Sequence, residues 1–417
     1  MRKMKSSGAE WIGDIPDSWS MVKLGTIYEE RNEKVSDEEY QALSVTMGGI
    51  VPQLDSAVKS DVRDNRKHIC EGDFVINSRS DRRGAYGVSA YDGSCSLINI
   101  VLKPRNKEEV AYFNYVLETA RFPDEFYRWG SGIVSDLWST RWDSMKRIVL
   151  PLPSEVERKK IVNFLDENCK RIEKLIAHET QLIKKLLEYR ESVITEKTTQ
   201  GLNPKVNRKE SGQAWLGIIP SHWDVVYSKK LFSLRKEKAL SSDKQLTSSQ
   251  KYGIILQSDF MELEGRQVMQ VVTGEDILKH VGVGDFVISM RSFQGGLEYS
   301  TLEGKISSAY VMLIPNHELI ESDYYKWLFK SQRYIKALQS TSNLVRDGQA
   351  LRFSNFCQVY LPYFSKEEQR EIGDYLNKKC ESIDKLIEKS QCLISKLQEY
   401  RQAMIYEYVT GKKKVSE

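Results

Sequence analysis

The residue types best suited to recognise another molecule gather in one arginine-rich segment, residues 79–86, which reads Arg-Ser-Asp-Arg-Arg-Gly-Ala-Tyr. Arg79, Arg82 and Arg83 bring three guanidinium groups next to the aromatic ring of Tyr86. A guanidinium group can donate two hydrogen bonds to the major-groove edge of guanine, which discriminates against a wrong base by ~1–3 kcal/mol. The segment therefore indicates a DNA contact, although arginine-rich loops are also common as solvated surface. A second basic cluster precedes it and consists of Arg63, Arg66 and Lys67.

The residue patterns of catalytic centres are incomplete in this sequence. The only Asn-Pro dipeptide, Asn203-Pro204, is followed by Lys205 and lacks the aromatic residue of an amino-methyltransferase pocket. Gly282 and Gly284 form half of a dinucleotide-binding fingerprint, whose third glycine is absent. The five histidines are isolated and the six cysteines include no Cys-x-x-Cys pair, so we expect neither a metal site nor a catalytic centre. Scattered cysteines are typical of a chain in a reducing cytoplasm.

The composition fits a folded chain that crosses no membrane. Its 417 residues, 40% of them apolar, suffice for two or three domains. We expect no membrane contact, because no apolar run approaches the ~20 residues that span a bilayer. Lysine and arginine number 62 against 58 acidic residues, which leaves a net charge of +4. A DNA contact would therefore have to come from local basic clusters and not from a basic domain.

The sequence repeats itself at an offset of 204 to 212 residues. The motif Trp-x-Gly-x-Ile-Pro-x-x-Trp begins at Trp11 and again at Trp215. The run Gly-Asp-Phe-Val-Ile begins at Gly72 and again at Gly284. A period of this length is too long for a solenoid and indicates a duplicated unit of one domain and one helix.

Each repeat begins with a domain that we expect to be mixed α/β (α+β). Short apolar runs bounded by Gly, Asn and Asp are typical of strands, and they alternate with longer amphipathic stretches. The predicted strands cover residues 74–76, 98–102, 286–288 and 310–314, and the predicted helices lie near residues 111–120 and 322–338.

A long helix is expected after each domain. Ser154 with Glu157, and Ser365 with Glu368, predict a capping box at each helix start. Beyond each cap, apolar residues recur at steps of three and four, which predicts a coiled-coil seam. Since neither seam can stay in water, we expect the two helices to pair in an antiparallel coiled coil. The seam residues are Leu165, Cys169, Ile172, Ile176, Ile183, Leu186 and Val193 in the first helix, and Leu376, Cys380, Ile383, Ile387, Ile394, Leu397 and Met404 in the second.

With these motifs in this order, the sequence resembles the specificity subunits of type I restriction–modification enzymes over essentially its whole length. The helix starts at residues 157–161 and 368–372 are similar to the family's Glu-Gln-x-x-Ile. The helix ends at residues 188–190 and 399–401 are similar to its Glu-Tyr-Arg. The first repeat departs from the pattern at Arg158, where Gln is usual.

The resemblance implies a non-catalytic subunit with two pseudo-symmetric target-recognition domains, residues 1–153 and 201–364. Each domain would read one half of a bipartite DNA target. The long helices, residues 154–200 and 365–411, would set the spacing of the half-sites and dock the partners, and residues 412–417 would form a basic tail. The implied partners are double-stranded DNA, two adenine methyltransferase subunits and the restriction subunits. S-adenosylmethionine, ATP and Mg would be bound by those partners and none of them by this chain.

Two other functions remain open at this point. The chain could be a structural coiled-coil scaffold, which would explain the helices but not two matched domains. It could also be the reader subunit of a system that only methylates DNA. Salt-dependent DNA binding in the presence of the methyltransferase separates the scaffold from the readers.

If the two domains read different half-sites, residues that they share are better candidates for phosphate contacts, and residues that differ are better candidates for base contacts. The shared pairs are Arg79 with Arg291, and Arg141 with Arg352, for which an ion pair is the alternative role. Gln294 suits adenine. The other candidates are Arg82, Arg83 and Tyr86 in the first domain, Phe293 beside Gln294 in the second, and Asn343 and Arg346 in a polar loop that parallels the one beginning at Ser131.

Overall fold

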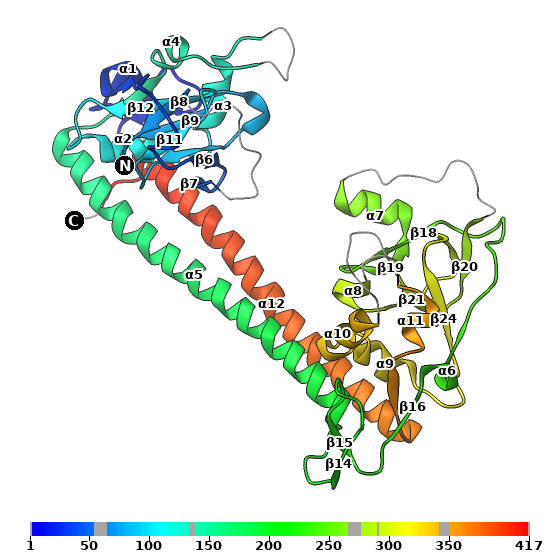
Figure 1. The fold of residues 1–417 in the computed structure, drawn as a ribbon. Coiled ribbons are helices and arrows are strands. Elements are labelled where there is room, and N and C mark those ends of the chain that lie inside the picture. Colours follow the sequence, from blue (N-terminus) through cyan, green and yellow to red (C-terminus); the bar gives the residue numbers. More distant parts are fainter. Residues whose placement is uncertain are drawn as a thin grey trace. The chain divides into compact units, whose positions relative to one another are not determined.

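The computed structural model describes residues 2–53, 65–132, 138–265, 277–289, 292–341 and 351–415. The chain forms two compact units, Met1–Glu179 with Cys392–Glu417, and Thr180–Gln391. Each unit holds one mixed α/β domain together with a segment of each long helix, α5 (Glu155–Gln200) and α12 (Lys366–Val409), as Figure 1 shows.

The centre of the first unit is a four-stranded antiparallel sheet with the strand order β10–β9–β12–β4. Its inner strands are β9 (Phe74–Asn77) and β12 (Asn99–Pro104), with Phe74 opposite Leu102. All four side chains of β9 are buried, as expected for a strand covered on both faces. The other elements are β1 (Met4–Ser6), β2 (Asp14–Pro16), β3 (Ser20–Lys23), α1 (Leu24–Ile27), β4 (Tyr28–Glu30), β5 (Lys34–Val35), β6 (Leu43–Thr46), β7 (Gly49–Pro52), β8 (Arg66–Ile69), the 3-10 turn η1 (Ser80–Arg82), β10 (Tyr86–Val88), β11 (Gly93–Cys95), α2 (Val110–Leu117), α3 (Phe122–Arg128), α4 (Trp142–Met145) and β13 (Val149–Leu152).

The second unit repeats this topology. Its central sheet has the order β22–β21–β24–β17, in which each strand is the counterpart of one in the first unit. The inner strands are β21 (Phe286–Ile288) and β24 (Val311–Pro315), with Phe286 opposite Leu313. The other elements are β14 (Arg208–Glu210), β15 (Ile218–Pro220), β16 (Asp224–Tyr227), α6 (Ser228–Leu231), β17 (Phe232–Leu234), β18 (Leu246–Ser249), β19 (Gly253–Leu256), α7 (Gln257–Glu264), β20 (Lys279–Val281), α8 (Ser292–Gly295), β22 (Glu298–Tyr299), β23 (Gly304–Ile306), α9 (Ser322–Leu328), α10 (Gln332–Ser340), α11 (Phe353–Phe356) and β25 (Tyr360–Tyr363).

The predicted helix over residues 322–338 is wrong in one respect, because the structure divides it into α9 and α10. Ser331 has extended backbone dihedral angles, and its hydroxyl oxygen accepts a hydrogen bond from the backbone N–H of Tyr334. A serine in this role ends one helix and begins the next. The apolar spacing continues through the break, so periodicity alone did not reveal it.

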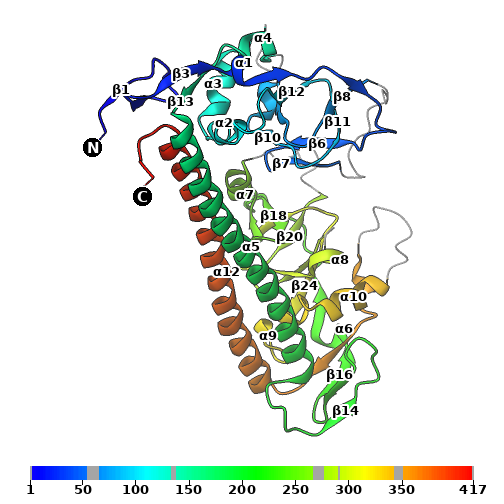
Figure 2. The same ribbon diagram turned by 90° about the vertical axis from the view of Figure 1, so that its left-hand side faces the viewer.

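The two long helices pair in antiparallel orientation, which confirms the predicted coiled coil. In the first unit the ring of Phe164 on α5 lies 4.4 Å from that of Tyr408 on α12, and Glu173 lies 3.8 Å from Arg401. Residue numbers thus rise along α5 while they fall along α12. In each unit the helix segments lie side by side (Figures 1 and 2), and every predicted seam residue is buried or half-buried. Among the described helices, none has both the length and the apolar run needed to cross a bilayer.

The capping residues at the helix starts also tie each helix to its domain. The hydroxyl oxygen of Ser154 accepts the backbone N–H of Glu157 at 3.3 Å, as predicted. The carboxylate of Glu157 does not complete the capping box but accepts Nε1–H of the buried Trp19 at 2.9 Å. Trp223 and Glu368 repeat this bond at 3.1 Å. The second tryptophan of each entry motif is therefore a packing anchor for the helix that follows its domain.

Candidate nucleic-acid interface

A polar cavity of about 410 Å³ lies in the first unit between the β6–β7 hairpin and the segment that follows β9. Arg66, Arg79 and Arg82, three of the predicted DNA contacts, line it. They share its wall with the side-chain amides of Asn77 and Asn99. Guanidinium and amide groups are the ones with which proteins most often read base edges, so the lining suits a nucleobase.

The backbone around Arg79 brings predicted contact residues from three separate segments together. Arg79 is exposed, and its backbone N–H donates to Oδ1 of Asn77 at 3.0 Å. Arg79 forms a β-bridge with Ser139, and Ser139 forms a second bridge with Ser131. The exposed Arg141 follows two residues after Ser139. Arg79, Ser131 and Arg141 are thus neighbours in space, although the chain separates Arg79 from Ser131 by 52 residues and from Arg141 by 62.

Arg82 and Arg83 differ in what they contact. Arg82 is exposed and lines the cavity. Nη1 of Arg83 lies 3.2 Å from Oδ1 of Asp124, and its guanidinium group lies 5.4 Å from the ring centre of Tyr127. An exposed ion pair of this kind contributes little free energy, but it holds the Arg83 side chain away from the cavity. The geometry therefore favours Arg82 over Arg83 as a base contact.

Other predicted contact residues already have partners within the fold. Nε of the buried Arg66 donates to Oγ of Ser94 at 2.9 Å. Nζ of Lys67 lies 2.8 Å from the carboxylate of Glu30. The half-buried ring of Tyr86 packs against the core, and burial raises the pKa of Tyr86 to about 12. These contacts favour a scaffold role for Lys67 and Tyr86, whereas Arg66 also faces the cavity.

Asn99 is a candidate contact residue that the sequence analysis did not single out. It stands directly opposite Asn77 in the β12–β9 register, and each residue is only 5% exposed. Oδ1 of Asn99 is buried and has no hydrogen-bond partner among the described residues. Since buried polar atoms normally find a partner, this oxygen is a candidate acceptor for the amino group of a base. Paired asparagines in a buried strand pair were the sequence signal that could have indicated it.

The second unit has a cavity of about 470 Å³ beside the β18–β19 hairpin and α8. Gln294, the predicted adenine contact, is exposed and lines it together with Tyr252 and Lys330. Arg352 is also exposed, and its backbone N–H donates to Oδ1 of Asn355 at the start of α11. Five predicted contacts have no described side chain: Arg63, Arg291, Asn343 and Arg346 lie outside the described residues, and Phe293 is described only in its backbone.

The two cavities share part of their framework. Each is lined by a β-hairpin, β6–β7 or β18–β19, and by the segment that follows β9 or β21. The second cavity also takes residues from α5, β22, α9 and α10, whereas the first takes residues from β8 and from the start of β12. The side chains differ, with Arg79 and Arg82 in the first cavity and Gln294 in the second. A partly shared frame with different polar groups is what two readers of different sequences require.

The second cavity also contains a buried charge pair. The carboxylate of Glu298 accepts a hydrogen bond from Nζ of Lys330, which also donates to the carbonyl oxygen of Gly295 at 3.1 Å. Burial raises the pKa of Glu298, and the nearby ammonium group of Lys330 opposes this shift. Lys330 is therefore held by acceptors within the protein, which makes it a poorer candidate for a phosphate contact than its charge suggests.

Similar proteins were found by sequence and by structure, although no family model matches the chain. A specificity subunit of the type I restriction enzyme MjaX from Methanocaldococcus jannaschii is 21% identical over 423 residues, covering 97% of this chain and 96% of the relative. A solved chain described under "Structural basis underlying complex assembly and conformational transition of the type I R-M system" has a TM-score of 0.65 at 17% identity, covering 96% of this chain and 99% of its own length. The HsdS subunit from Thermoanaerobacter tengcongensis has a TM-score of 0.49 at 16% identity, covering 96% and 98%.

The sequence match extends over nearly the full length of both proteins, and the fold is shared over the same length. The motifs of the entry segments and of the helix starts and ends occur twice, in the order expected for this family. The chain is therefore similar over nearly its whole length to a type I restriction enzyme specificity subunit, and it shares its fold with a solved chain of a type I R-M system.

Proposed function

We propose that this chain recognises a bipartite DNA target, with one half-site read by each α/β domain. The helices α5 and α12 would fix the distance between the half-sites and provide the surface on which methyltransferase subunits dock. We infer from the similarity to a specificity subunit that this chain is a non-catalytic part of its system. The chemistry would therefore belong to partners: two adenine methyltransferase subunits that bind S-adenosylmethionine, and restriction subunits that use ATP and Mg.

One observation supports this proposal most strongly. Each repeat forms a polar cavity beside its β6–β7 or β18–β19 hairpin, and the side chains that line the cavities differ between the repeats. A duplicated scaffold protein would have no need for two such cavities. In the first unit the exposed groups near the cavity are Arg79, Arg82 and Arg141, which suit phosphates and guanine edges. In the second unit Gln294 suits adenine.

The experiment that tests the proposal is methylation mapping in cells that carry the complete system. Strains with and without this gene are compared by sequencing that detects methylated adenine. We expect a gene-dependent motif with two specified parts separated by unspecified bases. A motif that persists without the gene, or one with a single uninterrupted specified part, would contradict the proposal.

DNA binding by the purified complex separates the two remaining alternatives from this function. A scaffold would leave the affinity of the methyltransferase for DNA unchanged, whereas a reader raises the affinity for its target with a marked dependence on salt. A methylation-only system would show the same binding and the same motif but no ATP-dependent cleavage of unmethylated target DNA. Each of the three functions thus predicts a different pair of results.

A further inference from the structure

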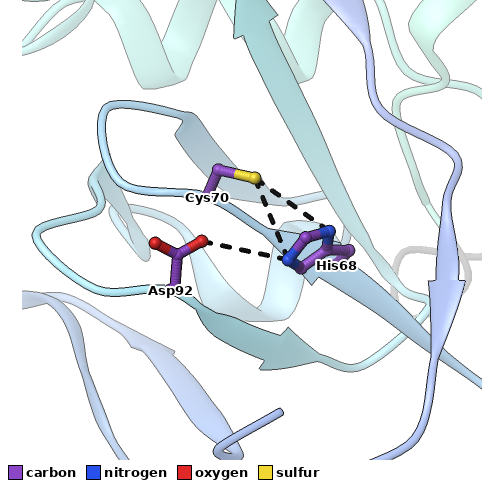
Figure 3. A group of neighbouring side chains, drawn as sticks. All are labelled: His68, Cys70 and Asp92. Carbon is purple, nitrogen blue, oxygen red and sulfur yellow. Dashed lines mark hydrogen bonds and ion pairs between the residues drawn. The ribbon is translucent and has the colours of Figure 1, made fainter. Parts of the chain in front are cut away.

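Three side chains of the first unit meet in an arrangement that the isolated histidines of the sequence did not predict. His68 on β8, Cys70 just after it and Asp92 just before β11 point toward one another (Figure 3). Each residue offers one potential ligand atom, and these three atoms all lie within 4.8 Å of one another. Sγ of Cys70 is 3.9 Å from Nε2 of His68, and Oδ1 of Asp92 is also 3.9 Å from this nitrogen. His68 is buried, Cys70 is half-buried and Asp92 is exposed, so one side of the group faces solvent.

A carboxylate on the other side of the ring sets the orientation of His68. Nδ1 of His68 lies 3.0 Å from Oε2 of Glu33, and the ring also stacks against Tyr40, with ring centres 4.4 Å apart. When Nδ1 donates its hydrogen to Glu33, Nε2 keeps the lone pair that can bind an ion. Sγ of Cys70 lies 4.0 Å from Nδ1 and 3.9 Å from Nε2, so the thiol side chain must turn toward Nε2 to share an ion with it. Histidine ligands of metals are oriented in this way, with a carboxylate on the nitrogen that does not bind the ion.

The position of Cys70 is fixed by a buried ion pair. The backbone N–H of Cys70 donates to Oδ2 of Asp73 at 2.9 Å, and the same oxygen accepts Nε–H of Arg31 at 2.7 Å. The turn from Cys70 to Asp73 is therefore held independently of the thiol. A preformed turn lowers the cost of placing the sulfur atom at a binding site.

We propose that His68, Cys70 and Asp92 form a binding site for Zn²⁺, with water as the fourth ligand. In a tetrahedral site with bonds of about 2.0–2.3 Å, neighbouring ligand atoms lie about 3.5 Å apart. Sγ of Cys70 and Oδ1 of Asp92 each lie 3.9 Å from Nε2, and rotation of the half-buried Cys70 and exposed Asp92 side chains would bring them to the ion. Imidazole, thiolate and carboxylate together suit this borderline-soft ion, whereas Mg²⁺ and Ca²⁺ prefer oxygen ligands alone. Binding would release the proton of the Cys70 thiol to solvent.

The second unit provides a natural comparison for this site. His280 occupies the place of His68 on β20, with Asp243 2.8 Å from Nδ1 and Glu303 3.6 Å from Nε2. Gly282 stands where Cys70 does, and its backbone N–H makes the same bond, at 2.8 Å, to Asp285. The fold thus repeats the histidine, its carboxylates and the turn, but not the thiol. We expect thiolate-dependent metal binding in the first unit alone.

The bound ion would join two strands that border the candidate DNA cavity. His68 lies on β8 and Asp92 directly precedes β11, and within this strand pair Arg66 donates to Ser94. Oγ–H of Ser94 donates in turn to the carbonyl oxygen of Tyr40, whose ring contacts His68. Zn²⁺ would therefore stabilise the strand that carries Arg66 without touching DNA itself. This inference does not depend on the proposed function, because it concerns metal affinity alone.

Titration of the full chain, freed of metal by a chelator, with Zn²⁺ and then Co²⁺ tests the proposal. We expect one Zn²⁺ per chain, and with Co²⁺ a near-ultraviolet thiolate charge-transfer band that saturates at the same ratio. Cys70→Ser should abolish the band. Glu33→Gln, which removes the orienting carboxylate, should weaken Co²⁺ binding about 10- to 100-fold.

Matched variants separate this site from accidental binding. Cys392→Ser removes an exposed thiol elsewhere, and Asp243→Asn removes the carboxylate beside His280, so both should leave the band unchanged. Asp92→Asn alters an exposed ligand and should weaken binding while the far-ultraviolet circular dichroism stays that of the parent. The proposal is overturned if no band forms, if the band survives Cys70→Ser, or if Cys392→Ser removes it.

Discussion

The hydroxyl group of Tyr112 on α2 donates a hydrogen bond to the backbone carbonyl oxygen of Val409 at 2.7 Å, across 297 residues of sequence. Val409 is the last residue of α12, where a helix leaves carbonyl oxygens without helical partners. Tyr324 makes the equivalent bond to Thr198 near the end of α5, at 2.6 Å. Near the C-terminal end of each long helix, a backbone carbonyl oxygen therefore accepts a hydrogen bond from a tyrosine of a domain.

We predict that Tyr112→Phe lowers the free energy of unfolding of the first unit by about 1 kcal/mol, because it leaves the Val409 carbonyl group buried without this donor. Tyr324→Phe should have a similar effect on the second unit. Urea denaturation followed by hydrogen exchange at the helix ends measures both effects. Tyr91→Phe, at a side chain that is 41% exposed, is the control and should change neither value. Equal stability of Tyr112→Phe and the parent would show that this bond does not stabilise the docking of the helix end.

The repeat made the long helices, the duplicated domains and the coiled-coil seam predictable. Each of these features follows from patterns that are local in sequence: apolar spacing, Gly-Asp turns and helix caps. The same local signals correctly indicated strands such as β9 and β21, whose residues Phe74 and Phe286 are fully buried. Because the patterns occur twice, an error in one repeat could be detected in the other.

The contacts of individual side chains were not predictable, since they depend on strand register. Arg66 was predicted as a DNA contact within a basic cluster, and the pairing of β8 with β11 buries it against Ser94, 28 residues further along the chain. The same pairing brings Asp92 near His68, which local spacing did not suggest. Glu157 fitted a capping box, yet its carboxylate accepts a hydrogen bond from Trp19, 138 residues earlier in the chain. The roles of these residues thus depend on partners that are distant in sequence, which local sequence patterns do not reveal.

Base recognition in the first unit can be separated from phosphate contact by a pair of variants. We predict that the double variant Arg79→Ala with Arg82→Ala weakens binding of one half-site. Each of these two arginines that reads a base should contribute about 1–3 kcal/mol to the lost binding free energy. Arg83→Ala should have a smaller effect, because this side chain is engaged by Asp124 and Tyr127. The measurement is binding of the complex to targets that carry substitutions in either half-site.

The control for this experiment is Arg105→Ala, which removes an exposed arginine paired with Glu29 on another part of the same unit. If the double variant loses affinity equally for target and unrelated DNA, and its salt slope falls by about one for each arginine, the two residues contact phosphates. If binding is unchanged at both half-sites, the cavity in the first unit is not part of the interface.

The stability of the second unit should depend on the protonation of Glu298, which is only 5% exposed. Burial raises its pKa above the ordinary value of 4.5, so the folded state holds this proton to higher pH than the unfolded state does. The favourable contribution is complete below pH 4.5 and is lost as the pH rises through the raised pKa. Within that window, the free energy of unfolding contributed by this group must fall with increasing pH.

We therefore predict that Glu298→Gln makes the stability of the second unit less dependent on pH above 4.5 than in the parent protein. Urea denaturation at a series of pH values gives the slope of the free energy of unfolding against pH for the variant and for the parent. Glu318→Gln, at an exposed position of the same unit, should reproduce the slope of the parent. A steeper fall in stability with pH for Glu298→Gln would mean that Lys330 lowers the pKa of Glu298 more than burial raises it.

The spacing role proposed for the helices can be tested by lengthening both of them together. Glu173 pairs with Arg401 and Arg190 pairs with Asp384, so insertions after Glu179 in α5 and after Leu393 in α12 fall between matched contacts. Seven residues preserve the heptad seam and add about 10 Å at ~1.5 Å per residue. At ~3.4 Å per base pair, we predict that the spacer of the target grows by about three base pairs, while both half-sites keep their sequence. Methylation mapping reads this result directly. Seven residues inserted into α5 alone break the matched pairing and should abolish recognition, and an unchanged spacer in the doubly lengthened protein would show that the helices do not set the distance.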